Sequence, residues 1–248
     1  MYTSKGVIEH VMTSEIMSDA EDSAHPASSA LGTKEYWDAH YAVELGNYQE
    51  SQDEGEIWFG KQAETRAVQY LVAQAKEGAR VLDFGCGNGH FLRRLRSSRI
   101  EWGALRGTDY SEPSIDLCKK IEEEQREDGE REIKYTVFDI LSADSLAAMG
   151  DARFDFIHDK GTWDAISLSD ERTARLAAYR RALAALLAED GQFVIVSCNY
   201  TTAELRDFFV DDQQLEFVSE LPETKQTAAF SFGGKTGAPF HTAVFRRK

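Results

Sequence analysis

The segment VLDFGCGNG, residues 81–89, joins a short apolar run to three glycines at alternate positions. An apolar run of this length predicts a buried strand. Glycine is needed where the chain turns sharply, or where a ligand approaches the backbone without a Cβ in the way. The residues that follow predict a helix, whose first N–H groups can bind a phosphate or a carboxylate. The segment therefore predicts a nucleotide-binding α/β domain.

The glycine spacing differs from that of dinucleotide enzymes. Those enzymes carry Gly-x-Gly-x-x-Gly, whereas here His90 stands where the third glycine would follow Gly85 and Gly87. A histidine there would obstruct the close approach that a pyrophosphate requires. The loop therefore favours a ligand with a single adenosine. Asp83, at the end of the strand, can accept from the ammonium of such a ligand or fix the loop.

Apolar runs and helical patterns alternate on both sides of this segment, and such alternation predicts a doubly wound, mostly parallel α/β sheet. One helix is predicted to begin near Thr33, a second to span 61–76, and a third to end near Ser97. Further helices are predicted to begin at Ser111, to span 171–188 with Leu187 facing inward, and to begin at Thr201. Strands are predicted at 80–84, 104–108, 133–138, 154–158, 192–198, 215–218 and 242–245, the last pair being an antiparallel addition. The acidic stretch 121–132 is interpreted as a solvated helix end and turn.

Length and charge limit the class of protein. The 248 residues suffice for one large domain. We expect a flexible leader at 1–30 and a domain at 31–248, with a helical cap at 31–77 and a Rossmann-like core at 78–248. A formal charge of −15 disfavours nucleic acid and anionic membranes and favours a basic protein partner, with solubility as the competing explanation. We expect a monomer in the cytoplasm, with the nucleus as a further location.

The three cysteines, Cys86, Cys118 and Cys198, are widely spaced and form no CxxC pair. Neither a disulfide framework nor a metal site is therefore expected. All three are interpreted as reduced, small packing residues.

Acidic residues follow the next two predicted strands. Asp109 closes the second strand, where a carboxylate commonly accepts both ribose hydroxyls of an adenosine. Asp139 follows the third strand and could meet the adenine amino group, with Phe138 or Ile140 covering the ring. Helix capping and a simple turn are the respective alternatives.

The segment DKGTWDA, residues 159–165, follows the fourth strand. In open α/β sheets, ligands lie over the carboxyl ends of the strands. A charged pair, a glycine and a tryptophan at that edge favour a functional site, with an ion-paired loop as the alternative.

Three further segments, GEIWFG at 55–60, SCNYT at 197–201 and FSFGG at 230–234, complete a pattern. With residues 81–89 and 159–165, they resemble the class I methyltransferases. More closely, they resemble the elongation factor 1A lysine methyltransferase 2 family, over roughly residues 32–245. The glycine loop is typical of the whole superfamily, whereas 55–60 and 159–165 are far more specific.

The resemblance implies a seven-stranded Rossmann-like fold, S-adenosylmethionine as methyl donor, and a lysine of a basic protein, elongation factor 1A, as acceptor. Resemblance and position together predict three groups of residues. Donor contacts are expected from Trp58, Asp83, Gly85, Gly87, Asn88, Asp109, Tyr110, Asp139, Ile140 and Asp159. Acceptor contacts are expected from Trp58, Phe59, Asn199 and Tyr200. The catalytic group is expected to comprise Asp159, Lys160 and Trp163. The fourth strand does not end in (Asn/Asp)-Pro-Pro-(Tyr/Phe), which argues against nucleobase methylation.

An acceptor lysine must be neutral to react, although the ordinary lysine pKa is about 10.4. Burial lowers that pKa, and Trp58, Trp163 or Tyr200 could supply aromatic walls for it. Asp159 could hold the incoming ammonium or take its proton through water. Lys160 is expected to pair with an acid.

Three other functions remain open at this point. They are a small-molecule N-methyltransferase, a non-catalytic donor-binding scaffold, and a nicotinamide-dependent oxidoreductase.

Overall fold

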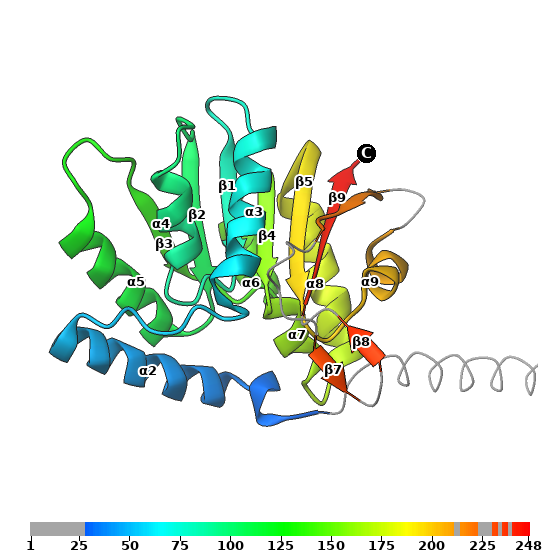
Figure 1. Cartoon of the computed structure of the whole chain (residues 1–248), viewed down its shortest axis with the longest axis horizontal. Coiled ribbons are helices and arrows are strands. Elements are labelled where there is room, and N and C mark those ends of the chain that lie inside the picture. The colour runs from blue at the N-terminus through cyan, green and yellow to red at the C-terminus, as the bar shows by residue number, and fades with distance from the viewer. Residues whose placement is uncertain (1–27, 211–213, 223–229, 233–234, 238–239) are drawn as a thin grey trace, which may run out of the picture.

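A seven-stranded sheet forms the centre of the molecule (Figure 1). The computed structural model describes residues 28–210, 214–222, 230–232, 235–237 and 240–248. The strands are β1 (Arg80–Phe84), β2 (Ala104–Asp109), β3 (Ile133–Val137), β4 (Phe154–Lys160), β5 (Leu187–Ser197), β6 (Leu215–Glu220) and β9 (His241–Arg247). Their order is β3-β2-β1-β4-β5-β9-β6. β9 runs antiparallel to β5 and β6, whereas β1 to β5 pair in parallel. The predicted fold class is confirmed.

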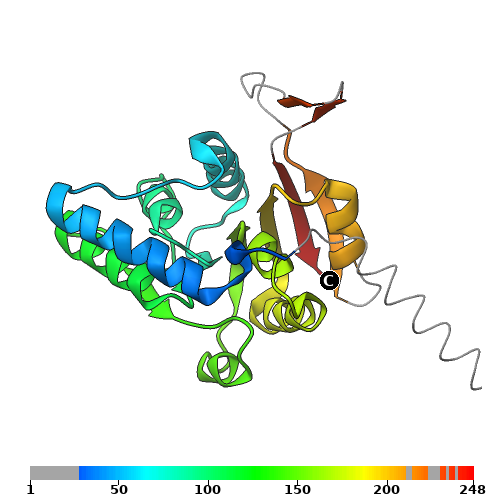
Figure 2. The ribbon, with the colours of Figure 1, turned by 90° about the horizontal axis from the view of Figure 1, so that it is seen from below.

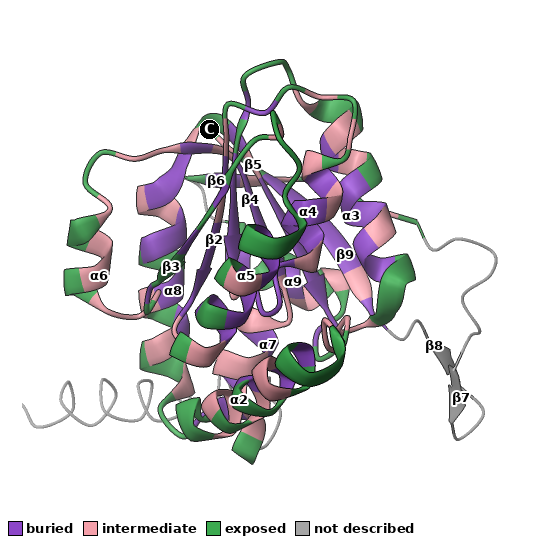
Figure 3. Cartoon of the chain, turned by 90° about the vertical axis from the view of Figure 1, so that its left-hand side faces the viewer, coloured by how far each residue is buried: buried purple, intermediate pink, exposed green. Residues whose placement is uncertain are grey.

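Helices cover both faces of this sheet, as Figure 3 shows by the buried strands between them. One face carries α3 (Gly60–Gln74), α4 (His90–Arg96) and α5 (Glu112–Gln125). The other carries α6 (Ala143–Ala148), α7 (Thr162–Ser167), α8 (Arg172–Leu186) and α9 (Thr202–Phe209). A separate pair, β7 (Phe230–Phe232) and β8 (Lys235–Gly237), forms a two-stranded sheet. Within the described ranges, no helix combines the length and apolar character needed to cross a bilayer.

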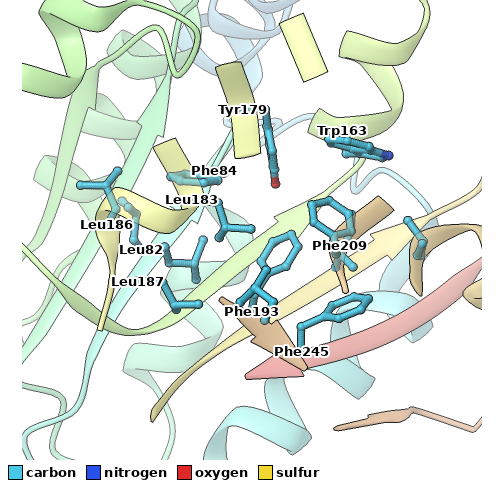
Figure 4. Close-up of a cluster of buried hydrophobic side chains, with 14 of the residues drawn as sticks. Leu82, Phe84, Trp163, Tyr179, Leu183, Leu186, Leu187, Phe193, Phe209 and Phe245 are labelled. Atoms are coloured by element: carbon cyan, nitrogen blue, oxygen red, sulfur yellow. The ribbon is translucent and has the colours of Figure 1, made fainter. Parts of the chain in front are cut away.

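Successive strand residues pack on opposite faces, which explains why a central strand such as β1 carries apolar residues at neighbouring positions. Val81 faces α3 and α4, whereas its neighbour Leu82 faces α8. The α8 side contains an aromatic cluster that includes Tyr179, Phe193 and Phe245 (Figure 4). Both cores are formed by residues far apart in sequence, so each core is complete only when these distant segments pack together.

The N-terminal elements cross the carboxyl edge of the sheet. The short helix η1 (Ala30–Gly32) leads into α2 (Lys34–Ser51), which runs beside α5 (Figures 1 and 2). Thr33 caps α2, because its side chain accepts a hydrogen bond from the N–H of Tyr36. The strand order reverses between β1 and β4, and these strands end side by side, with Phe84 opposite Asp159. A ligand site is expected beyond such a switch point.

A buried carboxylate fixes the helix that follows β4. Asp159 Oδ1 accepts a hydrogen bond from the N–H of Thr162 at 2.9 Å. Its Oδ2 accepts from the N–H of Trp163 at 3.0 Å and from the hydroxyl of Tyr179 at 2.6 Å. The first turn of α7 is therefore held by the preceding strand, and α8 is joined to both through Tyr179.

Several details differ from the sequence-based predictions. Leu187 begins β5 and is buried there, so its predicted place on the preceding helix is wrong. The acidic stretch is not wholly solvated, because Glu122 is buried and accepts hydrogen bonds from Arg96 at 2.7 Å. The six-residue helices α6 and α7 were not predicted, because such short elements have little periodicity. Most of the expected leader, residues 1–27, lies outside the described residues.

Replacing Asp159 by asparagine should destabilise the fold. The new amide group cannot accept, so at least one buried donor among its three partners loses its bond. A loss of about 2 kcal/mol is expected, which corresponds to a fall in Tm of roughly 4–8 °C for a domain of this size. The fall in Tm is measured by thermal unfolding. Asp151→Asn, at an exposed position, is the control and should leave Tm unchanged. An equal Tm for both variants would contradict the anchoring role of Asp159.

Candidate active site

A pocket lies at the carboxyl edge of the sheet, the edge that faces the viewer in Figure 2. The ends of β1, β2 and β4 form its floor, while α2 and the segment after it form its roof. The wall comprises residues from 31–41, 56–59, 85–88, 108–110, 138–141, 160–168 and 198–199, together with Arg175. The pocket therefore collects residues from most of the segments singled out in the sequence.

The glycine loop lies on the floor of this pocket. Gly85 and Gly87 adopt φ angles of +64° and +55°, which L side chains rarely adopt. A Cβ on Gly87 would also stand 2.6 Å from the hydroxyl oxygen of Tyr41, and one on Gly85 would stand 1.9 Å from Oγ1 of Thr162. Both positions require glycine, and the loop presents bare backbone to the pocket.

Asp109 joins the end of β2 to the glycine loop. Its Oδ2 accepts from the N–H of Gly87 at 3.2 Å, and its Oδ1 accepts from the N–H of Ser111 at 3.0 Å. Burial raises the pKa of Asp109 to about 6, against the lowering effect of these two donors. The pocket thus has a carboxylate on its wall whose protonation changes close to neutral pH.

Beyond Asp109, the pocket wall is mostly apolar. Phe138 and Ile140 both line it, and Phe138 is buried. Asp139 lines the wall too, but its Oδ1 accepts from the N–H of Leu141 at 2.9 Å, which is a turn contact. Tyr110 lines the same region and donates its hydroxyl proton to the carbonyl of Thr33 at 3.3 Å.

An aromatic group from two segments forms the roof. The ring of Trp37 lies 5.1 Å from that of Trp58, at 64°, and 6.0 Å from that of Tyr41, at 24°. All three rings line the pocket. Sequence reasoning predicted a helix from about Thr33 but did not identify Trp37 and Tyr41 as site residues. The signal was that the face they share is aromatic on an otherwise polar helix.

The segment from Glu54 to Phe59 is clamped to the glycine loop and to α2. The side-chain amide of Asn88 donates to the carbonyls of Glu54, at 2.9 Å, and Glu56, at 3.1 Å. From α2, the carboxylate of Glu44 accepts from the N–H of Glu56 at 2.8 Å. The main role of Asn88 at the pocket is therefore to hold residues 54–59, which form the rim of the pocket.

Phe59 occupies a strained position at this rim. Its φ angle of +62° lies in the left-handed region, which is costly for a residue with a Cβ. Its ring stacks on that of Phe240 at 6.5 Å, and it covers Gly161, where a Cβ would come within 3.1 Å of the ring. The packing of this ring holds the strained backbone in place over the end of β4.

Lys160 lines the pocket at the end of β4. The expected pairing with an acid is not seen in the part of the chain that the structure describes, where Lys160 makes no ion pair or hydrogen bond with any side chain. Burial lowers its pKa, whereas Asp83 and Glu64 act in the opposite direction.

Four of the predicted site residues lie outside the pocket wall. Asp83 is buried, with Oδ1 2.7 Å from Nδ1 of His158. Asp159 has both oxygens occupied beneath the wall, as described above, so neither its donor contact nor its acceptor role fits this placement. Trp163 and Tyr200 belong to the hydrophobic core, where the Trp163 ring lies 5.2 Å from that of Tyr179 (Figure 4). Neither ring can wall the acceptor.

The end of β5 completes the far side of the pocket. Asp164 accepts from the N–H of Cys198 at 2.8 Å and from the hydroxyl of Ser197, which fixes this turn. Asn199 lines the pocket and is exposed. Cys198 is exposed too, so its interpretation as a packing residue is wrong, whereas Cys86 and Cys118 are buried. Among the described residues, no three His, Cys, Asp or Glu side chains are grouped to hold a metal ion.

The residues present suit S-adenosylmethionine. The glycine loop is a cradle that a Cβ would fill, and Asp109 supplies a carboxylate of the kind that holds ribose hydroxyls. Phe138 and Ile140 offer an apolar surface for an adenine ring. Donor contacts by these residues, Tyr110 and Trp58 remain predictions.

The comparisons with known proteins agree with this site. Residues 75–235 match a family described as a methyltransferase domain. EEF1A lysine methyltransferase 2 from Danio rerio is 40% identical over 89% of this chain and 89% of its own length. The protein of the same name from Homo sapiens is 38% identical over 93% of this chain and 91% of its own length.

A solved structure confirms the fold independently. A TehB-like SAM-dependent methyltransferase from Corynebacterium glutamicum superposes with a TM-score of 0.56 at 20% identity, covering 85% of this chain and 98% of that one. Its likeness concerns the fold alone. The family match, the relatives and the fold together show that the chain belongs to the class I, S-adenosylmethionine-dependent methyltransferases, in the EEF1A lysine methyltransferase 2 family.

Proposed function

We propose that this protein transfers a methyl group from S-adenosylmethionine to a lysine of translation elongation factor 1A. The observation that carries the proposal is identity of 38–40% with relatives named for that activity, over about nine-tenths of each chain. The pocket supports it, because the motifs shared with the family in the sequence, residues 55–60, 81–89 and 159–165, meet around one cavity.

The proposed donor contacts follow from the geometry of the floor. Asp109 would hold the ribose hydroxyls, while the bare backbone at Gly85 and Gly87 admits the amino-acid end. Phe138 and Ile140 would cover the adenine. The donor brings a methyl group already activated on a sulfonium, so the protein's task is to orient the partners and exclude water.

The proposed acceptor entrance lies between Trp58, Phe59 and Asn199, which line the pocket beyond the glycine loop. The two aromatic rings suit the aliphatic part of a lysine side chain. Glu56 lines the same rim and is exposed, so its carboxylate can attract an ammonium from solvent. The net charge of −15 would aid encounter with a basic substrate.

We also propose that the protein acts as a monomer without binding nucleic acid. Its net charge, which repels phosphate backbones, supports the second point. The proposed location is the cytoplasm, with the nucleus as a second compartment.

The acceptor is tested by incubating the protein with isotopically labelled donor and purified elongation factor 1A, followed by intact mass spectrometry and peptide mapping. Label on one lysine of the factor is expected. The control is the same reaction on a factor whose mapped lysine is replaced by arginine. Label that appears only on small molecules from a cell extract would instead make the protein a small-molecule methyltransferase.

Donor affinity should depend on pH through Asp109. Because the pKa of this carboxyl is about 6, it is charged above that pH and becomes protonated below it, and a protonated carboxyl accepts hydrogen bonds less well. Calorimetric binding of S-adenosylhomocysteine should therefore weaken as the pH falls from 8 to 5. Asp109→Asn should bind at least about tenfold more weakly at pH 8, with a flatter pH profile. Asp151→Asn should behave as the wild type; a pH-independent wild type would refute the role of Asp109.

Two substitutions at Phe59 should separate fold from function. Both remove the ring, but glycine also relieves the left-handed backbone, so Phe59→Gly should be more stable than Phe59→Ala by about 1 kcal/mol. Both variants should lose about tenfold or more in kcat/KM for the protein acceptor, with unchanged affinity for S-adenosylhomocysteine. If activity followed stability, so that the glycine variant recovered, Phe59 would be a structural residue only.

A further inference from the structure

Lys160 lies where β4 ends in the pocket. Side chains alternate along a strand, so Lys160 shares a face with Phe156 and His158, which pack toward α3 and α4. Its neighbour Asp159 points to the opposite face and Tyr179. Of these adjacent charged residues, only Lys160 therefore reaches the pocket wall.

Two cations line the pocket within the described residues, Lys160 and Arg175. Arg175 lies 3.9 Å from the carboxylate of Glu171, whereas Lys160 has no such partner among the residues that the structure places. The acids that influence Lys160 lie on several elements, and most are engaged elsewhere. Glu64 on α3 contacts His90 and Arg94, and Asp83 on β1 contacts His158. Asp159 contacts Tyr179, and Asp164 on α7 contacts Ser197. Glu56 on the rim is exposed.

This arrangement bears on how an acceptor lysine becomes neutral. Asp159 and Asp164 point their oxygens at protein donors rather than at the space that an incoming ammonium would occupy. Glu56, at the exposed rim, favours the charged form during approach. Deeper in the pocket, the ammonium would meet Lys160, whose charged form Asp83 and Glu64 favour against the effect of burial. Like charges in a partly buried site disfavour the protonated form of the acceptor.

We propose that Lys160 acts as a positioning residue whose positive charge drives the proton off the acceptor lysine. This inference rests on the proposed lysine methyltransfer. The acceptor ammonium releases its proton to solvent as it passes from the rim to the end of β4. The neutral nitrogen then forms the new N–CH3 bond, and the electron pair of the broken C–S bond stays on the donor's sulfur. The methylated ammonium is again repelled by Lys160, which favours either loss of a proton or departure.

The charge of Lys160 would change the pKa of the acceptor amine substantially. A unit charge about 5 Å away, at the effective dielectric of partly buried sites, lowers the pKa of an amine by about two units. Acceptor pKa values near 8 to 9 would follow, so the reactive form becomes accessible at physiological pH.

The test compares Lys160→Met, which removes the charge, with Lys160→Arg, which retains it. In kcat for elongation factor 1A against pH, which reports groups in the enzyme–substrate complex, the acid limb should move up by about one to two units in Lys160→Met and stay in place in Lys160→Arg. At pH 7.5 the methionine variant should lose about ten- to a hundredfold, recovered in part at pH 9.5. Affinity for S-adenosylhomocysteine should not change. Lys61→Met, an exposed lysine on α3, is the matched control and should resemble the wild type.

A second measurement does not depend on turnover or on the identity of the acceptor. Nα-acetyl-lysine amide is titrated into the S-adenosylhomocysteine complex at pH 9, in two buffers of different ionisation enthalpy. That pH lies above the expected pKa of the bound amine and below the ordinary lysine pKa of about 10.4, so wild type and Lys160→Arg should release most of one proton for each amine bound, and Lys160→Met close to none.

The two measurements distinguish the possible failures. An unchanged acid limb and unchanged proton release in Lys160→Met would overturn the proposal. A tenfold loss of S-adenosylhomocysteine affinity with an unmoved acid limb would overturn it as well, and would assign Lys160 to the donor's carboxylate. Proton release that depends on Lys160 without methylation of elongation factor 1A would support this role and reject the proposed acceptor.

Discussion

The buried carboxylate of Asp159 is the interaction on which the ligand edge of this protein depends. A charge enclosed in the core is tolerated only when donors satisfy it, and here the donors come from α7 and α8. The turn at Gly161 is trapped between the strand and its anchored helix. Gly161, in that turn, lies against the ring of Phe59 and supports it. A carboxylate that lies outside the pocket wall thus determines where that wall stands.

A second set of bonds joins the donor region to the acceptor region. Asn88 belongs to the glycine loop, yet its amide holds the backbone of the rim at Glu54 and Glu56. Glu44 on α2 accepts a hydrogen bond from the backbone of the same rim. A shift of the loop would therefore reach Trp58 and Phe59 through these short, partly buried hydrogen bonds.

Much of this fold could be predicted from sequence, because most strands carry a local apolar pattern and the glycine loop has a local backbone requirement. The site was harder to predict. DKGTWDA lies at the pocket, as its place after the fourth strand indicated. Adjacent strand residues point to opposite faces, however, and a short motif does not reveal which of them reach the pocket. Lys160 reached the pocket, whereas Asp159 and Trp163 faced the core. Trp37 and Tyr41 were missed because the roof forms only when α2 folds back across the sheet.

The position of β9 has a consequence for how the chain is made. This strand, His241–Arg247, lies between β5 and β6 and supplies the only neighbour of β6 in the described sheet. During synthesis, β6 leaves the ribosome before β9 and must wait without a partner, with its edge exposed. Residues 80–197 can begin to assemble earlier, since β1 to β5 pair among themselves. The nascent chain therefore passes through a stage with an open sheet edge, when chaperones would be most needed.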